Sequence, residues 1–248
     1  MTQTLAGQTV LITGGARRLG AAMARALHAV GANVVIHHLT STQEAGTLVA
    51  ALNQARAASA TAVQADLLDV AHLPGLVDSA IRHFGRLDIL INNASTFYPT
   101  PIGEISLGQF EDLIGTNLRA PLFLVQAAAA ELRRRRGLIL NMVDIHGMKP
   151  LKNYPAYSSA KAALIMLTKA LARELAPEVR VNGIAPGPVM WPADVDAAMQ
   201  AQIIDKTLLL RSGEPQDIAQ AAVYFATMAP YVTGQILAVD GGRSQTSG

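Results

Sequence analysis

Tyr157 and Lys161 are the residues whose types and spacing most clearly allow chemistry. They lie four positions apart in a stretch expected to be helical, so both side chains share one face. A phenol can transfer a proton, and a cation beside it favours the phenolate and lowers its pKa. We therefore expect Tyr157 to act as an acid with Lys161 lowering its pKa, although a Tyr-x-x-x-Lys pair on its own often arises by chance.

A glycine-containing turn, Thr13 to Gly20, follows the first apolar run of the chain. Its glycines let the backbone approach a phosphate, and the N-terminus of the helix that follows favours negative charge. Turns of this kind are common. Its position after the first expected strand, together with Asn92-Asn93-Ala94 at the end of the fourth, predicts a dinucleotide site.

The end of the second expected strand indicates which dinucleotide would bind. An acidic residue there would bind a ribose 2′-hydroxyl and repel a 2′-phosphate. The strand instead ends in His37-His38-Leu39-Thr40-Ser41, with no carboxylate before Glu44, and Arg17 and Arg18 lie on the adjacent turn. A cationic, hydroxyl-bearing pocket favours NADPH over NADH. The alternative is that the two histidines simply end a strand.

These residues are expected to be positioned by alternating strands and helices. Apolar runs predict strands at about 9–13, 33–38, 61–66, 87–92, 138–143, 180–184 and 235–239. Helical patterns between them cover about 19–30, 41–56, 70–84, 107–135 and 154–175. The alternation predicts an α/β fold, one doubly wound Rossmann domain over residues 1–248. Its mostly parallel seven-stranded sheet would carry helices on both faces and bind ligands at the carboxyl ends of its strands.

Composition excludes several other classes of protein. The 248 residues are 50% hydrophobic and 15% charged, which is enough apolar material for a full core. Lys+Arg exceeds Asp+Glu by only two (20 against 18), which argues against nucleic acid or a membrane as partner. The one basic cluster, 133–136, is interpreted as a solvated helix end.

The absence of cysteine excludes disulfides, Cys-based zinc sites and Cys nucleophiles, and we expect no metal site. The N-terminus lacks the features of a signal peptide, and no apolar run reaches membrane-spanning length. These features predict a soluble, cytoplasmic protein.

Taken together, the motifs resemble those of the short-chain dehydrogenase/reductase family over essentially the whole chain. They stand in the family's order and spacing: Thr13–Gly20, Asn92-Asn93-Ala94, Asn117, Tyr157-Ser158-Ser159-Ala160-Lys161 and Val181-Asn182-Gly183-Ile184-Ala185-Pro186-Gly187. The resemblance implies a Rossmann fold, an NAD(P)(H) cofactor and a homotetramer built on the two long helices.

The resemblance also implies roles for single residues. Lys161 would hold the nicotinamide ribose, Asn117 would support a proton-relay water, and Asp66 would contact the adenine edge. The residues expected to bind the cofactor are Gly14, Arg17, Arg18, Leu19, Gly20, His37, Thr40, Ser41, Asp66, Leu67, Asn93, Ala94, Ser95, Tyr157, Lys161, Pro186, Gly187 and Val189.

Two departures from the family pattern resemble the pteridine reductases. Arg18 stands where a glycine is usual, and Asp144 replaces the usual serine thirteen residues before Tyr157. In that group the residue matching Phe97 stacks on the pterin, and the residue matching Ser95 contacts cofactor and substrate.

One position departs from the pteridine reductases as well. The arginine that they carry near the 2′-phosphate is Thr40 here, so a preference for NADPH would rest on Arg18, His37 and Ser41.

The expected reaction is NADPH-dependent reduction of a dihydropterin or dihydrofolate to the tetrahydro form. The catalytic residues would be Asp144, Tyr157, Lys161 and Asn117. Substrate would contact Ser95, Phe97, Asp144, Tyr157 and Trp191, the last in a segment reaching Arg211 that is interpreted either as a substrate lid or as packing.

Two other functions stay open, a carbonyl reductase acting on a 3-oxoacyl thioester or ketone and a cofactor-binding regulator without catalysis. Asp144 favours the pterin, because a serine hydroxyl donates to a carbonyl oxygen whereas a carboxylate only accepts. Intact Asn117, Tyr157 and Lys161 argue against a regulator.

The two long helices are expected to carry apolar residues on more than one face. Leu164-Ile165-Met166-Leu167 is an example. Such a surface needs a partner, either the sheet or another subunit, and the resemblance favours a tetramer with closed symmetry.

Overall fold

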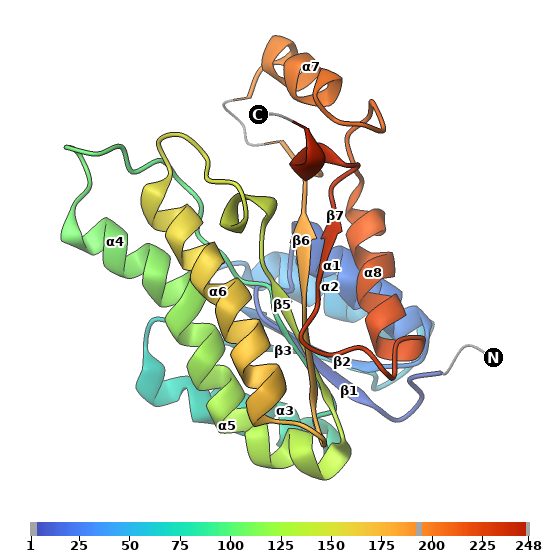
Figure 1. Cartoon of the computed structure of the whole chain (residues 1–248). Coiled ribbons are helices and arrows are strands. Elements are labelled where there is room, and N and C mark those ends of the chain that lie inside the picture. Colours follow the sequence, from blue (N-terminus) through green and yellow to red (C-terminus); the bar gives the residue numbers. More distant parts are fainter. Residues whose placement is uncertain (1–3, 192–194, 247–248) are drawn as a thin grey trace.

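Within the described residues, 4–191 and 195–246 of the computed structural model, seven strands form one sheet (Figure 1). The strands are β1 Thr9–Ile12, β2 Asn33–His38, β3 Ala60–Gln64, β4 Ile89–Asn92, β5 Leu138–Met142, β6 Arg180–Pro186 and β7 Ile236–Val239. Their order is β3-β2-β1-β4-β5-β6-β7, and every pairing is parallel. The expected fold class is therefore confirmed, with a wholly parallel sheet in place of a mostly parallel one.

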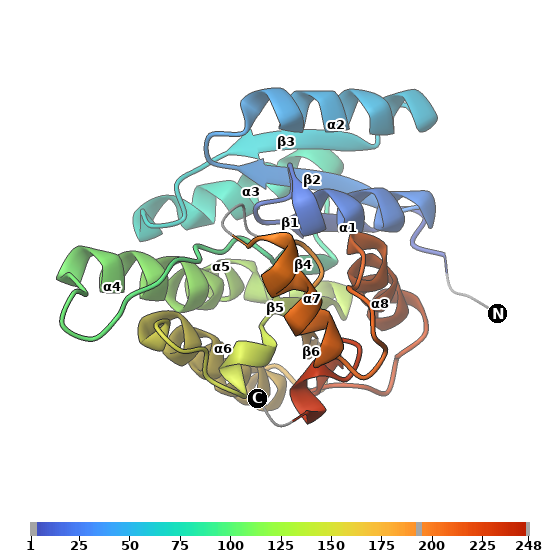
Figure 2. The same ribbon diagram turned by 90° about the horizontal axis from the view of Figure 1, so that it is seen from above.

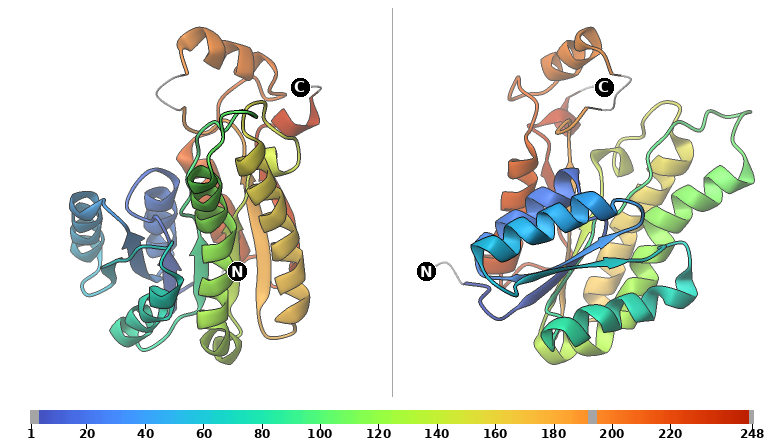
Figure 3. Two further views of the ribbon diagram at one scale, coloured as in Figure 1. Left: turned by 90° about the vertical axis from the view of Figure 1, so that its left-hand side faces the viewer. Right: turned by 180° about the vertical axis from the view of Figure 1, so that it is seen from behind.

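Helices cover both faces of the sheet (Figure 2). One layer holds α1 Arg18–Ala29, α2 Thr42–Ala55 and α8 Pro215–Thr227, and the other holds α3 Leu73–Phe84, α5 Ala120–Arg135 and α6 Pro155–Glu174. Helix α4 Leu107–Ile114 continues the line of α5, and α7 Ala197–Asp205 lies beyond the carboxyl ends of the strands (Figure 3). None of the helices in the described ranges is long and apolar enough to cross a membrane.

The strands are buried because their side chains alternate between the two layers. In β1, Val10 and Ile12 pack in the cluster formed with α1, α2 and α8, whereas Leu11 packs in the cluster formed with α3, α5 and α6. All three are fully buried. Successive side chains of a strand point to opposite faces, and helices cover both faces of this sheet. The strands are therefore continuous apolar runs and do not alternate between apolar and polar residues.

The strand order reverses at β1, which pairs with β2 on one side and with β4 on the other. In an open parallel sheet this reversal leaves a crevice outside the carboxyl ends of the strands. The turn after β1, the segments after β4, β5 and β6, and helix α7 all gather at this end (Figure 1). The motifs found in the sequence are thus brought to one edge.

The helix expected over 107–135 is divided by a π-helical segment, Gly115–Arg119, between α4 and α5. The backbone N–H of Ala120 reaches the carbonyl of Gly115, five residues back. The side-chain amide of Asn117 donates to the carbonyl of Leu113 at 3.0 Å, an oxygen that a regular α-helix would offer to the backbone N–H of Asn117. Such π segments often occur at functional sites.

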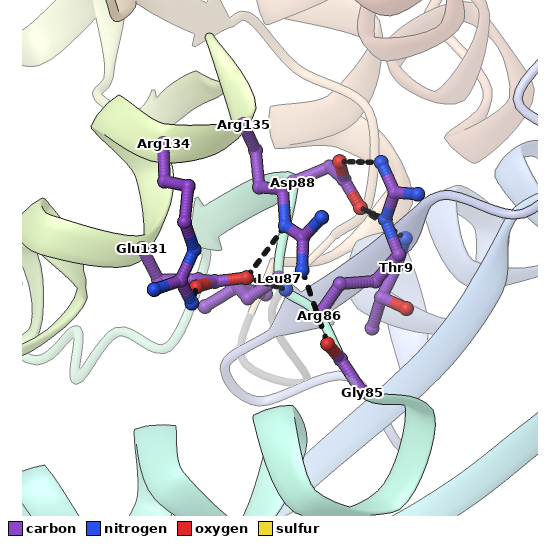
Figure 4. Close-up of polar contacts among 8 residues, drawn as sticks. All are labelled: Thr9, Gly85, Arg86, Leu87, Asp88, Glu131, Arg134 and Arg135. Atoms are coloured by element: carbon purple, nitrogen blue, oxygen red, sulfur yellow. Dashed lines mark hydrogen bonds and ion pairs between the residues drawn. The ribbon is translucent and has the colours of Figure 1, made fainter.

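The arginine run 133–136 is not simply a solvated helix end, and this interpretation is corrected (Figure 4). Arg134 and Arg135 pair with Glu131, which is only 4% exposed. Arg135 also donates to the carbonyl of Gly85 at 3.1 Å, and Glu131 accepts from the backbone N–H of Leu87 at 3.3 Å. The buried carboxylate explains Arg134 and Arg135, because its charge requires partners, whereas Arg133 and Arg136 are exposed at the end of the helix. The cluster ties the end of α5 to the segment before β4.

Candidate active site

Asp144, Tyr157 and Lys161 lie together at the carboxyl end of β5. The phenol of Tyr157 donates a hydrogen bond of 2.7 Å to Oδ2 of Asp144. Lys161 Nζ donates to the carbonyl of Met142 at 2.9 Å and lies 5.6 Å from the centroid of the Tyr157 ring. Tyr157 and Lys161 are buried on the first turns of α6, which begins at Pro155. Proline suits this first position because its missing N–H would have no helical partner.

The pKa of Tyr157 is shifted in the direction opposite to the expected one. Burial raises the pKa of the phenol well above its usual value, the charge of Asp144 and its hydrogen bond raise it further, and a hydrogen bond from Ser95 acts the other way. The amine of Lys161 donates to the carbonyl of Met142, and burial lowers its own pKa to about 8. Tyr157 therefore keeps its proton at neutral pH and can donate it.

Asp144 is held through both carboxyl oxygens. Oδ1 accepts the backbone N–H of His146 at 2.8 Å and so caps a short 3₁₀ turn, Ile145–Gly147, while Oδ2 accepts the phenol of Tyr157. The ring of His146 lies near the carbonyl of Lys149, with Nδ1 at 3.3 Å.

Ser95 and Asn117 extend the polar chain on the other side of the phenol. The hydroxyl of Ser95 donates to Oδ1 of Asn117 at 2.7 Å, and the amide of Asn117 donates to the carbonyls of Thr96 and Leu113. Asn117 is fully buried in the π-helical segment. It therefore fixes the segment that follows β4 to the helical layer and orients Ser95 toward Tyr157.

Phe97 forms an aromatic group with two tyrosines. Its ring stacks on Tyr154 with centroids 4.6 Å apart and planes at 15°, and it meets Tyr157 edge-on at 4.8 Å. Phe97 is still 41% exposed at the mouth of the site. Tyr154 was not among the expected site residues. The signal that could have found it is an aromatic residue one helical turn before Tyr157, just ahead of the same helix.

The segment that carries Phe97 is anchored at two further points. The phenol of Tyr98 donates to Oδ2 of Asp112 at 2.7 Å and to the carbonyl of Gln109 at 3.1 Å. The backbone N–H of Thr100 donates to the carbonyl of Asn153 at 2.7 Å. Helix α4 and the residues just before α6 thus both hold this segment, and neither contact was predicted from the sequence.

The glycine-containing turn is locked to the end of β4. The hydroxyl of Thr13 accepts the backbone N–H groups of Asn93 and Ala94 at 2.9 and 3.0 Å. A Cβ on Gly20 would lie 2.4 Å from the carbonyl oxygen of Gly14, and one on Gly14 would lie 3.0 Å from Cα of Ala94. These two glycines are required by close packing of the turn as well as by any phosphate.

His37 does not supply the positive charge that was expected of it. Its side chain is 2% exposed, Nδ1 accepts the backbone N–H of Gly14 at 3.1 Å, and Nε2 lies 3.1 Å from the carbonyl of Ala65. Since Nδ1 accepts, the proton of the neutral ring is on Nε2, which donates to Ala65. Burial lowers the pKa of His37 to about 4, so the ring is neutral at pH 7.

The other residues expected near a 2′-phosphate lie at the surface beside the turn. Arg17, Arg18 and Thr40 are exposed, and Arg17 Nη1 is 3.4 Å from Oε1 of Glu44. Arg18 has a φ of 51°, in the left-handed region that favours glycine. An arginine at this position costs about 1 kcal/mol of backbone strain, which accounts for the glycine that is usual in the family.

The remaining expected cofactor and substrate residues lie around the same edge. Asp66 is exposed and caps its own turn by accepting the N–H of Leu68 at 2.8 Å. Gly187 follows β6 and packs against Asp240, which a Cβ would meet at 2.6 Å. Trp191 is half-buried, and the expected lid includes residues 192–194, which lie outside the described residues.

Comparison with known proteins agrees with this geometry. A family model described as Enoyl-(Acyl carrier protein) reductase matches residues 14–244. The chain is 38% identical to "Pteridine reductase 1" of Leishmania tarentolae, over 99% of each protein. It is 34% identical to the 3-oxoacyl-[acyl-carrier-protein] reductase of Synechocystis sp., over 96% of this chain and 97% of that protein.

A solved structure resembles the whole chain as well. It is a blue fluorescent protein from a metagenomic library in complex with NADPH, with a TM-score of 0.90, 35% identity and coverage of 97% of this chain and 99% of that one. The fold, the motifs and these matches over nearly the full length lead to one assignment. The chain belongs to the short-chain dehydrogenase/reductase family of oxidoreductases.

Proposed function

We propose that this oxidoreductase uses NADPH to reduce a pterin, converting a dihydropterin or dihydrofolate to the tetrahydro form. The observation that carries the proposal is the contact of Asp144 with Tyr157, at 2.7 Å, beside the half-exposed ring of Phe97. A carboxyl group in place of the family's serine suits a substrate rich in N–H groups better than a carbonyl oxygen.

The residues around the turn fit NADPH. The end of β2 carries no carboxylate before Glu44, and Arg17, Arg18 and Thr40 are exposed beside the turn, which supports a role for them in holding a 2′-phosphate. Arg18 occupies a left-handed backbone position at a cost in strain, which supports a role for its charge. The solved relative that contains NADPH agrees with this assignment.

NADPH, when bound, supplies the hydride. Tyr157 supplies the proton to a ring nitrogen of the substrate, because its raised pKa keeps the phenol protonated at neutral pH. The phenolate that remains is reprotonated from solvent, and Asp144 can relay that proton across the 2.7 Å hydrogen bond after its carboxylate has taken it up. Lys161, buried beside the tyrosine, is positioned to hold the ribose and so to orient the cofactor.

Phe97 selects for a flat substrate. One side of its ring is covered by Tyr154, and its exposed part offers an aromatic surface next to the phenol that donates the proton. Aromatic pairs in offset or edge contact contribute about 0.5–1.5 kcal/mol beyond burial. A pterin stacked there would have its ring nitrogens close to Tyr157.

Reduction of a carbonyl compound is the second candidate, favoured by the relative from Synechocystis, a 3-oxoacyl-[acyl-carrier-protein] reductase. Both candidates need Tyr157 and Lys161, so these two residues do not separate them. Asp144 and Phe97 do separate them, because a small ketone needs neither a second carboxyl partner nor an aromatic surface.

We further propose that the enzyme is a homotetramer and acts in the cytoplasm. In the run 164–167, Leu164 is buried but Met166 is 63% exposed. Phe110 on α4 and Leu122 on α5 are also exposed. Exposed apolar side chains on adjacent helices suit an interface between subunits. Light scattering at assay concentration should give four times the mass of one chain, and a monomer would contradict the proposal.

The substrate is tested directly by following NADPH oxidation with several acceptors. Dihydrobiopterin and dihydrofolate are compared with an acetoacetyl thioester and simple ketones, in wild type and in Asp144→Ser and Phe97→Ala. We expect turnover of a pterin that falls in both variants, and inhibition by methotrexate. Reduction of ketones without turnover of any pterin would leave only the family assignment.

A further inference from the structure

We infer that His37 is a positioning residue that joins the three loops around the adenosine half of the cofactor, and that it does not bind the phosphate. The inference rests on the proposed NADPH cofactor, but it does not depend on which substrate is reduced. It follows from the contacts of the buried His37 ring, which lies at the end of β2, between β1 and β3.

His37 lies at the carboxyl end of β2, between β1 and β3. On the β1 side, its ring Nδ1 accepts the N–H of Gly14 at 3.1 Å, and its backbone carbonyl accepts the N–H of Gly15 at 2.9 Å. Two successive N–H groups of the glycine-containing turn are therefore held by this single residue. Their directions set where the rest of the turn presents its backbone to a dinucleotide.

On the β3 side, Nε2 donates to the carbonyl of Ala65 at 3.1 Å. Ala65 immediately precedes Asp66, the exposed carboxylate expected at the adenine edge. The ring thus spans the sheet from the phosphate-binding turn to the adenine-binding segment. Its own strand continues into Thr40 and Ser41, so all three sides of the adenosine pocket meet at His37.

A neutral imidazole suits this position for a reason of hydrogen-bond chemistry. A neutral ring has one acceptor and one donor nitrogen on opposite sides, which matches the N–H of Gly14 and the carbonyl of Ala65. A protonated ring has two donors and would face the N–H of Gly14 with a second N–H. A buried ring with both nitrogens occupied also has no donor left for a phosphate.

The two roles, positioning and phosphate binding, predict different cofactor dependence. If His37 bound the 2′-phosphate, its loss would weaken NADPH alone. If it aligns the loops, its loss weakens NADPH and NADH by a similar factor, because both contain the adenosine and the pyrophosphate. We expect an increase of about tenfold or more in both dissociation constants, because a misaligned turn loses contacts to groups that both cofactors contain.

The test uses three substitutions that separate the two hydrogen bonds. His37→Asn keeps an acceptor near the position of Nδ1, His37→Gln keeps a donor near the position of Nε2, and His37→Leu keeps neither. Isothermal titration calorimetry gives the dissociation constants of NADPH and NADH for each protein. We expect the largest and equal losses for His37→Leu, and partial recovery in the Asn and Gln variants.

His28→Leu is the matched control. His28 is also a buried histidine, at the end of α1, and its Nε2 lies 2.7 Å from the hydroxyl of Ser59, just before β3 begins, at the end of the sheet opposite to the cofactor site. Its removal should lower the melting temperature without changing either dissociation constant. If His37→Leu folds poorly, the comparison of the Asn and Gln variants with wild type still decides the matter.

A second measurement requires no cofactor. Nitrogen NMR of the free protein should show the proton of His37 on Nε2 and an acceptor Nδ1. The inference is overturned by a proton on Nδ1, by a loss confined to NADPH, or by unchanged affinity in His37→Leu. Absence of pterin turnover would count against the proposed substrate and leave this result intact.

Discussion

The ring of Phe97 lies parallel to that of Tyr154, at 4.6 Å, and edge-on to that of Tyr157, at 4.8 Å. Tyr154 and Tyr157 are separated by less than one turn at the start of α6, so the helix that supplies the proton donor also supports the aromatic surface. In the proposed reaction, binding of a flat substrate and placement of the proton would therefore be set by the same element.

The stacking surface should control affinity for the substrate more than turnover. Phe97→Leu keeps apolar bulk and removes the aromatic ring, so we expect KM for a dihydropterin to rise roughly tenfold while kcat changes little. Steady-state kinetics at saturating NADPH measures both. Phe110→Leu, an exposed phenylalanine on α4, is the control, and an equal effect there would contradict a specific role for Phe97.

Tyr157→Phe removes the proton that the substrate needs and keeps the ring against Phe97. We expect kcat to fall by about 10²-fold or more, with the dissociation constant of NADPH nearly unchanged. Lys161→Ala should lower turnover to a similar extent and also weaken NADPH. Fluorescence titration with NADPH separates the two variants, and wild-type turnover by Tyr157→Phe would refute the assignment.

Asp144→Asn tests the charge beside the phenol while keeping the shape of the side chain. The carboxylate raises the pKa of Tyr157, so its removal should bring that pKa down toward the ordinary value. The alkaline limb of the pH–rate profile should therefore move to lower pH in the variant. An alkaline limb at the same pH in both proteins would show that Asp144 does not act on Tyr157.

The buried Lys161 should make stability depend on pH in a defined direction. Its pKa is lowered from 10.5 to about 8, so between these values the unfolded chain binds more protons than the folded one. The free energy of unfolding then rises with pH from about 8 to 10.5, and the contribution is lost as pH falls through 8. The shift corresponds to about 3 kcal/mol.

Lys161→Met removes this titration and keeps the length of the side chain. The free energy of unfolding of both proteins is measured with denaturant at pH 7 and at pH 10.5. Relative to the variant, wild type should be more stable at pH 10.5 than at pH 7 by about 3 kcal/mol. The loss of the hydrogen bond to Met142 affects both pH values alike. A difference that does not vary with pH would contradict the shifted pKa.

The preference for NADPH should survive although His37 is neutral. Charge-assisted contacts to a phosphate are about 1.5–3 kcal/mol each, so kcat/KM for NADPH should exceed that for NADH by about tenfold or more. Arg18→Gly, which restores the residue usual in the family, should reduce the preference and relieve the backbone strain. Equal efficiency with the two cofactors in wild type would refute the electrostatic argument.

The sheet was predictable because each strand is a short apolar run next to a turn, and burial on both faces requires such runs. Asp144 and Tyr157 could be placed together because the end of β5 and the start of α6 adjoin the same edge. The direction of the Tyr157 pKa could not be predicted. It is set by burial and by the charge and hydrogen bond of Asp144, and spacing along a helix specifies neither.

The role of His37 was missed for a similar reason. A histidine at a strand end suggests a cation, but whether it is charged depends on burial and on the two backbone groups that its ring meets. Those groups come from turns far apart in the sequence. Tyr98 and Asp112 are likewise joined only when α4 folds against the segment after β4.

The π-helical segment Gly115–Arg119 has a consequence for how the active site can diverge. One extra residue advances every position beyond it by about 100° around the axis. The face of α5 is fixed by its packing in the core, but the face that α4 turns toward Tyr98 is set separately by this insertion. A change in the length of the segment can therefore reorient α4, and with it the segment that carries Phe97, while the sheet and Tyr157 stay where they are.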